Sequence, residues 1–347
     1  MHFTQLLTVS NILGVALSAS LPYNSHAPTW RTLAPIPLHA RQEQTTLFLP
    51  PSTIVIVGGV IPTNDTNFVA TTPLMQFYSI PTNTWSTKAP LPLPLNHLNV
   101  AVVDGKIYCL GGLAEETSQG RAWRAVADSW VYDPSTDAWT PLPGVPAGQL
   151  SGSAAVGVYD KKIYLAGGLK ELELYGTYTQ RTTSFVSIFD TVSKKWLQVS
   201  DAAKNLPEGR DHAGAAAVGG KMYVLGGRKD GQKNVKDTVF VLDLCDTKAG
   251  WKTSKAKMPT ARGGVATGVI GKKVYTFGGE GNTATESGIF DQVEAYDTVK
   301  DKWESVGTMK LPRHGTYAVG VGRKVYIPGG GVVQSGGAVA DFDVFEL

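Results

Sequence analysis

The stretch Gly219-Gly220-Lys221-Met222-Tyr223-Val224-Leu225-Gly226-Gly227 combines a hairpin tip, a short apolar strand and a terminal pair of glycines. Versions of it occur five more times, over residues 52–59, 104–112, 160–168, 271–279 and 322–330. The glycine pairs recur every 51 to 59 residues, and a regular period of this length indicates a repeat architecture. Because one repeat cannot bury both of its faces alone, the sequence predicts one domain of stacked repeats.

A tryptophan forms a second sixfold series, which comprises Trp30, Trp85, Trp139, Trp196, Trp251 and Trp303. Each repeat is expected to contain four strands, of which the second ends at the glycine pair and the fourth carries the tryptophan. The last repeat ends at residues 341–347 and has no tryptophan of its own. We therefore predict that the strand around Trp30 completes the last repeat, which closes a ring and removes two exposed sheet edges.

The glycine pair, a tyrosine three residues before it and a tryptophan about 25 residues after it resemble the kelch motif. The tyrosines are Tyr108, Tyr164, Tyr223, Tyr275 and Tyr326, whereas the first repeat has Val55 instead. Kelch proteins, like the central domain of galactose oxidase, are β-propellers with four-stranded blades around a channel. The resemblance implies an all-β, six-bladed kelch β-propeller over residues 28–347, with its last blade closed by an N-terminal strand.

The N-terminus has features of a secretory signal peptide. Residues 1–20 contain no Asp, Glu, Lys or Arg and include the apolar run 12–17 before Ser18-Ala19-Ser20. A polar link, 21–27, follows. The sequon Asn64-Asp65-Thr66 lies in an expected surface loop, where a glycan is tolerated. We expect a secreted glycoprotein without a membrane span in the mature chain; a disordered tail or an uncleaved anchor are the alternatives.

Composition excludes several classes of function. The formal net charge of +3 is too small for a nucleic-acid footprint, and no Lys/Arg run supports one. Cys109 and Cys245 are the two cysteines, too few for a disulfide framework. A Gly-rich phosphate loop, a Cys-x-x-Cys pair and a Gly-x-Ser-x-Gly elbow are absent from the sequence. We expect a monomer that binds no nucleic acid.

In three consecutive blades, arginines recur in the segment that leads into the blade, which we call the lead-in segment. Counting back sixteen residues from a glycine pair reaches Arg210, Arg262 and Arg313. Sixfold equivalence would bring these side chains to one sector of the channel mouth, where guanidinium groups suit a carboxylate, sulfate or enolate oxygen. The three arginines are therefore candidate substrate-binding residues. The alternative is that they only bond loop carbonyls around the channel.

Histidines cluster in the same lead-in segments. Counting back fourteen residues reaches Gln44, His97 and His212, and His314 follows Arg313 directly. Because an imidazole can move a proton near neutral pH, His212, His97 and His314 are candidate catalytic residues. No carboxylate pattern accompanies them, so the sequence predicts neither a metal site nor a cofactor.

Two long loops, 113–127 and 169–183, are predicted on the same face as the lead-in segments. Their aromatic residues, including Tyr175 and Tyr178, could stack on a sugar or an apolar ring. Arg228 and Glu280 directly follow their glycine pairs and should point toward the same mouth. These four residues join the candidate substrate-binding set, although solvated, variable loops are the alternative interpretation.

Two functions of different classes fit this pattern. The first is a cofactor-free isomerase or cyclase in carbohydrate or secondary metabolism, acting on a small polar or anionic molecule. It would be similar in outline to the secreted six-bladed kelch sialic acid mutarotases. The second is a non-catalytic module that binds a protein or a glycan through the loop face. The fold alone does not choose between them, because propellers serve both purposes.

Overall fold

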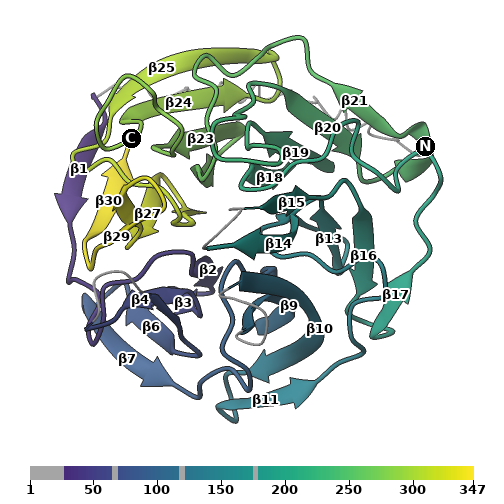
Figure 1. The fold of residues 1–347 in the computed structure, drawn as a ribbon, viewed down its shortest axis with the longest axis horizontal. Coiled ribbons are helices and arrows are strands. Elements are labelled where there is room, and N and C mark those ends of the chain that lie inside the picture. Colours follow the sequence, from purple (N-terminus) through teal and green to yellow (C-terminus); the bar gives the residue numbers. More distant parts are fainter. Residues whose placement is uncertain (1–26, 65–68, 117–121, 175–178) are drawn as a thin grey trace, which may run out of the picture.

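The structure is a computed structural model that describes residues 27–64, 69–116, 122–174 and 179–347. Over these residues, six antiparallel blades of four strands each surround one axis (Figure 1). Five blades are separate sheets, and the blade of residues 100–141 is part of a larger six-stranded sheet. The expected signal peptide, residues 1–20, lies outside the described residues, as do Tyr175 and Tyr178.

Each blade has the same order of strands from the axis outward. The innermost strands are β2 (Thr45–Leu49), β8 (Val100–Val103), β12 (Ala155–Tyr159), β18 (Gly214–Val218), β22 (Ala266–Ile270) and β26 (Val319–Val321). The second strands, which end at the glycine pairs or run through one, are β3 (Thr53–Val57), β9 (Lys106–Glu116), β13 (Lys162–Ala166), β19 (Lys221–Leu225), β23 (Lys273–Phe277) and β27 (Lys324–Pro328). The second strands are almost entirely buried, which explains their continuous apolar sequence.

The outer half of each blade carries the aromatic residues of the repeat. The third strands are β6 (Met75–Ser79), β10 (Ala122–Asp133), β16 (Val186–Asp190), β20 (Val239–Asp243), β24 (Gln292–Asp297) and β30 (Phe342–Glu346). The outermost strands are β7 (Thr84–Lys88), β11 (Ala138–Pro141), β17 (Lys195–Leu197), β21 (Trp251–Thr253), β25 (Lys302–Thr308) and β1 (Thr29–Thr32). A short 3-10 helix, Thr247–Ala249, precedes β21 and accounts for the extra residues of that repeat.

The N-terminal strand closes the ring, as the sequence predicts. Strand β1 pairs antiparallel with β30, so that Trp30 lies opposite Phe345 (Figure 1). The innermost strand of this last blade, β26, contacts both β22 and β2. The first and last repeats are therefore neighbours, and the ends of the chain share one blade.

Each tryptophan of the sixfold series links its blade to the preceding one. The indole N–H of Trp85 donates to the carbonyl of Ala34 over 2.8 Å, and that of Trp139 donates to Ala89 over 3.1 Å. Trp30 makes the equivalent bond to Thr308 over 3.1 Å, although the two residues are 278 positions apart. The tryptophan period thus reflects contacts between blades, with a large apolar surface buried beside one polar tip.

The lead-in segment of the next blade packs against each glycine pair. The amide of Gly279 donates to the carbonyl of Arg313 over 2.9 Å. At the preceding Gly278, φ is +57° and an added Cβ would lie 2.2 Å from the same carbonyl oxygen. Only glycine fits a backbone this close in a left-handed conformation.

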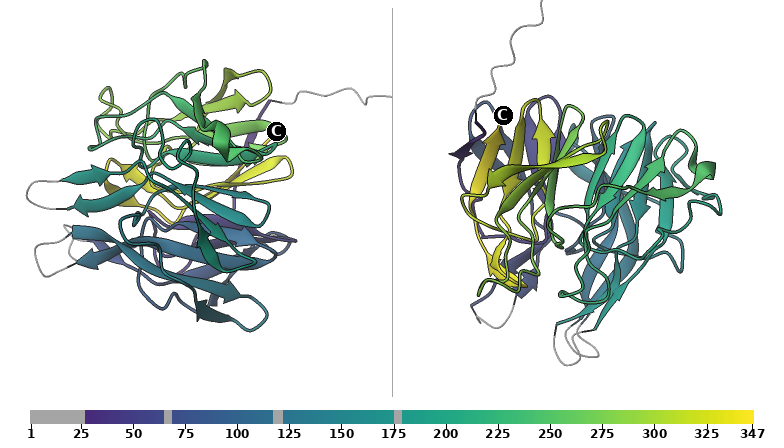
Figure 2. Two further views of the ribbon diagram at one scale, coloured as in Figure 1. Left: turned by 90° about the vertical axis from the view of Figure 1, so that its right-hand side faces the viewer. Right: turned by 90° about the horizontal axis from the view of Figure 1, so that it is seen from above.

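Three hairpins rise on the face where the lead-in segments lie: β4 (Val60–Pro62) with β5 (Val69–Thr71), β14 (Leu169–Glu173) with β15 (Gln180–Thr182), and β28 (Gly331–Val333) with β29 (Gly336–Ala338). Strands β9 and β10 also extend beyond their blade on this face, where β10 pairs with β14. Figure 2 shows these extensions projecting from one side of the ring. Strands β9, β10, β14 and β15 are hydrogen-bonded in one sheet, which forms a continuous wall over two blades.

Among the described residues, no helix is long and apolar enough to cross a bilayer. Cys109 is buried in β9, where burial raises the pKa of its thiol, and Cys245 is exposed on another blade. Both thiols are free.

Candidate functional site

A ring of left-handed residues surrounds the channel at the base of the loop face. One residue per blade has φ between 49° and 64°; the six are Glu43, His97, Ser153, His212, Gly264 and Gly315. Backbone hydrogen bonds join successive members, including His97 N–H to the Glu43 carbonyl over 3.0 Å and Ser153 N–H to the His97 carbonyl over 2.7 Å. Side chains of different blades are thereby held on one rigid frame.

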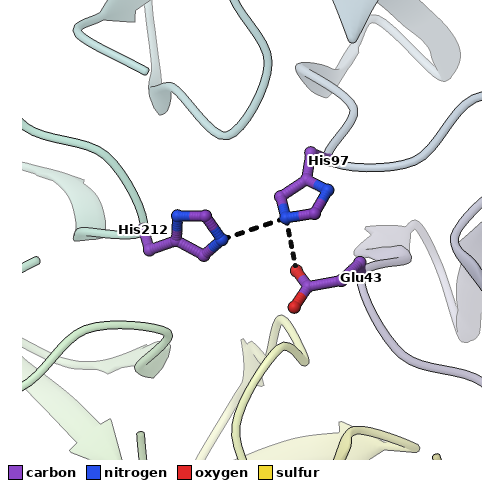
Figure 3. A group of neighbouring side chains, drawn as sticks. All are labelled: Glu43, His97 and His212. Atoms are coloured by element: carbon purple, nitrogen blue, oxygen red, sulfur yellow. Dashed lines mark hydrogen bonds and ion pairs between the residues drawn. The ribbon is translucent and has the colours of Figure 1, made fainter. Parts of the chain in front are cut away.

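Three members of this ring point toward one another from three blades (Figure 3). The Nε2 atom of His97 lies 2.9 Å from Nε2 of His212 and 3.2 Å from Oε2 of Glu43. All three side chains are buried. Gly315 makes room for Glu43, since an added Cβ there would lie 2.3 Å from the Glu43 Oε1 atom.

The outer nitrogen of each imidazole is held by its preceding residue. His97 Nδ1 lies 2.6 Å from Oδ1 of Asn96, whose Nδ2 donates to Thr71, and His212 Nδ1 lies 2.7 Å from Oδ1 of Asp211. These partners are acceptors, so each Nδ1 carries the proton and each Nε2 presents a lone pair. Burial, with the nearby His212 and Arg228, lowers the pKa of His97 well below the usual histidine value. His97 is therefore a neutral base.

Arg228 connects the imidazoles to two buried carboxylates. Its Nε donates to Asp211 Oδ1 over 3.1 Å, its Nη2 contacts His212 Nε2 at 3.1 Å, and its Nη1 pairs with Glu280. Burial alone would raise the pKa of Asp211, but the His212 hydrogen bond and the charge of Arg228 outweigh it, and the pKa lies below its usual value. The guanidinium is fixed by charge-assisted hydrogen bonds on two sides.

His314 and Glu280 form the other half of the floor. His314 Nε2 donates to the carbonyl of Val333 over 2.9 Å, and its Nδ1 lies 3.4 Å from Oε2 of Glu280. Glu280 also accepts from the amide of Ser335 over 3.0 Å. Burial would raise the pKa of Glu280, but His314 and Arg228 outweigh it and bring the pKa to about 2. Glu280 is an anion in the folded protein.

These groups form the floor of a cavity of about 560 Å³ on the loop face. Trp123 of β10 and Leu172 of β14 line its apolar wall, and the Trp123 ring lies 5.3 Å from that of His97. The opposite side consists of residues 230–234 and Ser335, where Gln334 donates to Gln232 over 2.8 Å across two loops. An apolar wall with convergent polar groups is typical of a small-molecule site.

The three arginines predicted to clamp an anion do not line this cavity. Arg262 is fully buried in its own blade, where Nη1 donates to Glu294 over 2.6 Å and Nη2 donates to Thr276 over 2.9 Å. Arg210 pairs with Glu208 over 2.7 Å, and Arg313 pairs with Asp343 over 2.8 Å. The expectation of an anion clamp is therefore wrong: each guanidinium already pairs with a carboxylate, which a neighbouring strand supplies to Arg262 and Arg313 and the lead-in segment itself supplies to Arg210.

The other predicted residues have different outcomes. His97, His212, His314, Arg228 and Glu280 meet at the cavity floor, as expected from their positions in the repeats. Asn64 is exposed just after β4. Tyr175 and Tyr178, candidates for substrate stacking, lie outside the described residues.

Two floor residues were not predicted. Glu43 occupies the ring position that counting assigned to Gln44, because the first lead-in segment is one residue out of register with the others. Asp211 was missed although it precedes His212 directly. Glu43 supplies the carboxylate that the counted lead-in positions lack. The reason for excluding a metal therefore does not hold, because atoms of Glu43, His97 and His212 lie within 4.8 Å of one another.

Comparisons with known proteins agree with the architecture. The sequence pattern of the KLHDC2/KLHL20/DRC7 Kelch-repeats domain matches residues 172–331, and the Kelch motif matches residues 94–146. A solved structure described as the structure of YjhT superposes with a TM-score of 0.70 at 19% identity, over 89% of this chain and 95% of that one. At that identity the likeness shows the fold alone.

Two curated relatives differ in how much of their length is matched. Kelch repeat and BTB domain-containing protein 1 of camelpox virus is 27% identical over 67% of this chain and 37% of its own length. Kelch-like protein terF of Aspergillus terreus is 42% identical over 96% of this chain and 72% of its own length. With the sixfold repeat and the closed ring of blades, this similarity shows that the chain belongs to the kelch-repeat family.

Proposed function

We propose that this protein is a small-molecule enzyme that moves protons on a polar substrate, as an isomerase or cyclase does. The observation that carries the proposal is the enclosed floor of ionisable groups beneath an apolar wall. Buried charges are costly unless they are paired, and they concentrate at functional sites. Here six buried ionisable groups line one cavity: Glu43, His97, His212, Arg228, Glu280 and His314.

His314 is the proposed proton carrier. Its tautomer is set by the bond from Nε2 to Val333, and Nδ1 faces the cavity floor near Glu280 without a hydrogen bond of good geometry. A carboxylate at 3.4 Å stabilises the imidazolium that forms when this nitrogen accepts a proton. His314 with Glu280 can thus take a proton from a substrate carbon or hydroxyl and return it elsewhere.

The charge of the floor favours a hydroxylated substrate without a negative charge. Glu43 and Glu280 line the floor, and Asp211 lies behind it in contact with Arg228, whose guanidinium is the one that lines the cavity among the described residues. The formal charge is therefore −2 with neutral imidazoles, and −1 when His314 is protonated. A carboxylate ligand would be repelled, while hydroxyl and carbonyl oxygens can accept from Arg228 and hydroxyl groups can donate to the carboxylates.

Exchange with heavy water tests this proposal. The protein is incubated in D₂O with a panel of reducing sugars and hydroxy ketones, and NMR follows exchange between anomers and deuterium incorporation on carbon. We expect acceleration over buffer for at least one compound, reduced about 10²- to 10⁴-fold by His314→Gln. His39→Gln is the matched control, because His39 is exposed and outside the cavity.

Two results would count against catalysis. Equal exchange by wild type and His314→Gln would remove the proposed proton carrier. No exchange with any compound, together with a captured protein or glycan whose binding is lost in Trp123→Ala, would favour the non-catalytic module.

A further inference from the structure

Three acceptor atoms of the cavity floor converge from three blades. Both imidazoles have their Nδ1 protons committed to Asn96 and Asp211, so their Nε2 lone pairs face each other at 2.9 Å. The carboxylate of Glu43 adds a third acceptor, 3.2 Å from His97 Nε2. Arg228 Nη2 reaches His212 Nε2 from one side at 3.1 Å, but His97 Nε2 and the Glu43 carboxylate repel each other unless a proton or a metal cation lies between them.

The separations suit a bound metal ion. Nitrogen and oxygen ligands about 2.1 Å from one ion are about 3.0 to 3.4 Å apart at octahedral and tetrahedral angles. The pairs His97–His212 and His97–Glu43, at 2.9 and 3.2 Å, are close to this range. All three ligand atoms lie within 4.8 Å of one another.

The surroundings resemble those that hold metal ligands in place. A metal-bound histidine usually donates its other ring N–H to a carboxylate or carbonyl oxygen, as His212 does to Asp211 and His97 does to the Asn96 amide. The backbone N–H of His97 donates a hydrogen bond to the carbonyl of Glu43 within the ring of left-handed residues. The floor is negative whether or not His314 is protonated, so a divalent cation would reduce an uncompensated buried charge.

We propose that Glu43, His97 and His212 bind one divalent first-row transition-metal ion at the channel mouth. Two imidazoles and one carboxylate favour Zn²⁺, Co²⁺ or Fe²⁺ over Mg²⁺ and Ca²⁺, which prefer oxygen ligands alone. Three protein ligands leave open positions toward the cavity, where an oxygen of a small molecule can bind. Arg228 Nη2, which now contacts the His212 lone pair at 3.1 Å, would then be free to donate to that oxygen.

This inference goes beyond the proposed function and does not depend on it. Metal content is measured without a catalytic assay, so the metal site can be tested even if the protein catalyses no proton transfer. Conversely, proton exchange by metal-free protein would leave the proposed function intact.

Metal titration tests the site. The purified full chain is stripped with a chelator and titrated with Zn²⁺ or Co²⁺ by calorimetry, with bound metal quantified by elemental analysis. We expect one ion per chain and a visible Co²⁺ absorption band typical of nitrogen coordination. His97→Asn and Glu43→Gln should each weaken binding on the order of 100-fold or more. Asparagine tolerates the left-handed backbone at His97, where φ is 49°.

His39→Asn is the control for adventitious binding, because it removes an exposed histidine outside the cavity. Glu43→Gln preserves the shape of the side chain and keeps the test valid if His97→Asn does not fold. Binding that is equal in wild type and Glu43→Gln would overturn the proposal, and so would a wild-type chain that retains no metal after dialysis.

Discussion

Replacement of Arg262 distinguishes a structural arginine from a ligand clamp. Arg262 is fully buried and donates to Glu294 over 2.6 Å, to Thr276 over 2.9 Å and to the carbonyl of Thr260 over 3.3 Å. Arg262→Met removes the positive charge and leaves the Glu294 carboxylate buried without a cationic partner. Because Arg262 lies outside the cavity, we expect the variant to lose stability and to retain ligand binding.

The magnitude follows from the contacts that are lost. Breaking a buried ion pair from one side costs about 3 to 5 kcal/mol, whereas removing both partners in favour of apolar side chains is often close to neutral. We expect Arg262→Met to lower the free energy of unfolding by about 4 kcal/mol. For a chain of this length, that corresponds to a fall in Tm on the order of 5 °C. The double variant Arg262→Met/Glu294→Met should recover at least half of the loss.

Urea unfolding of the wild type, the two single variants and the double variant provides the measurement, because the cycle isolates the pair. Ligand affinity, measured by thermal shift with any compound that stabilises the wild type, provides the second measurement. A Tm within 1 °C of wild type, combined with lost ligand binding, would refute the structural role and restore the anion clamp.

Three further predictions follow from the structure. Trp30→Ala removes the hydrogen bond to Thr308 and the edge contact with Phe345, whose ring centroid lies 5.2 Å away. The free energy of unfolding, measured with urea, should fall by about 2 to 3 kcal/mol. An unchanged unfolding midpoint would argue against closure by β1. Gly315→Ala should displace Glu43 and weaken both stability and metal binding. The control Gly322→Ala, at φ +62° with open space around an added Cβ, should cause backbone strain alone. Equal metal affinity in the two variants would exclude a clash between the Cβ added at position 315 and Glu43. We also propose that the chain is secreted and carries a glycan at the exposed Asn64. Protein from a eukaryotic secretory host should lack residues 1–20, and deglycosylation should lower its mass unless Asn64 is replaced by Gln. A full-length, unglycosylated product inside the cell would contradict this.

The backbone architecture was predictable because each repeat encodes its own strands and turns. The glycine pairs mark positions where backbones approach too closely for a side chain, and the tryptophans mark contacts between adjacent blades. Closure by the Trp30 strand followed from the missing tryptophan of the last repeat. The lead-in segments and the residues after the glycine pairs also indicated which face holds the cavity.

Side-chain destinations depended on neighbours that the repeat does not specify. Arg262 and His212 occupy positions two residues apart in equivalent lead-in segments. Arg262 pairs with Glu294 inside its blade, whereas His212 points toward His97 in the channel. A shift of one residue in the first lead-in segment put Glu43, instead of Gln44, beside His97.

The amino-acid sequence by itself determined the six blades, the closing strand and the family, because regular spacing reflects local backbone geometry and contacts between adjacent repeats. Only the tertiary structure decided which charged side chains meet. His97 and His212 are 115 residues apart, and their 2.9 Å contact arises from the curvature of the whole ring. Some buried charges pair within one blade, as Arg262 does with Glu294, but the contacts of Arg228 with Glu280 and of His97 with Glu43 join different blades, so no single repeat specifies them.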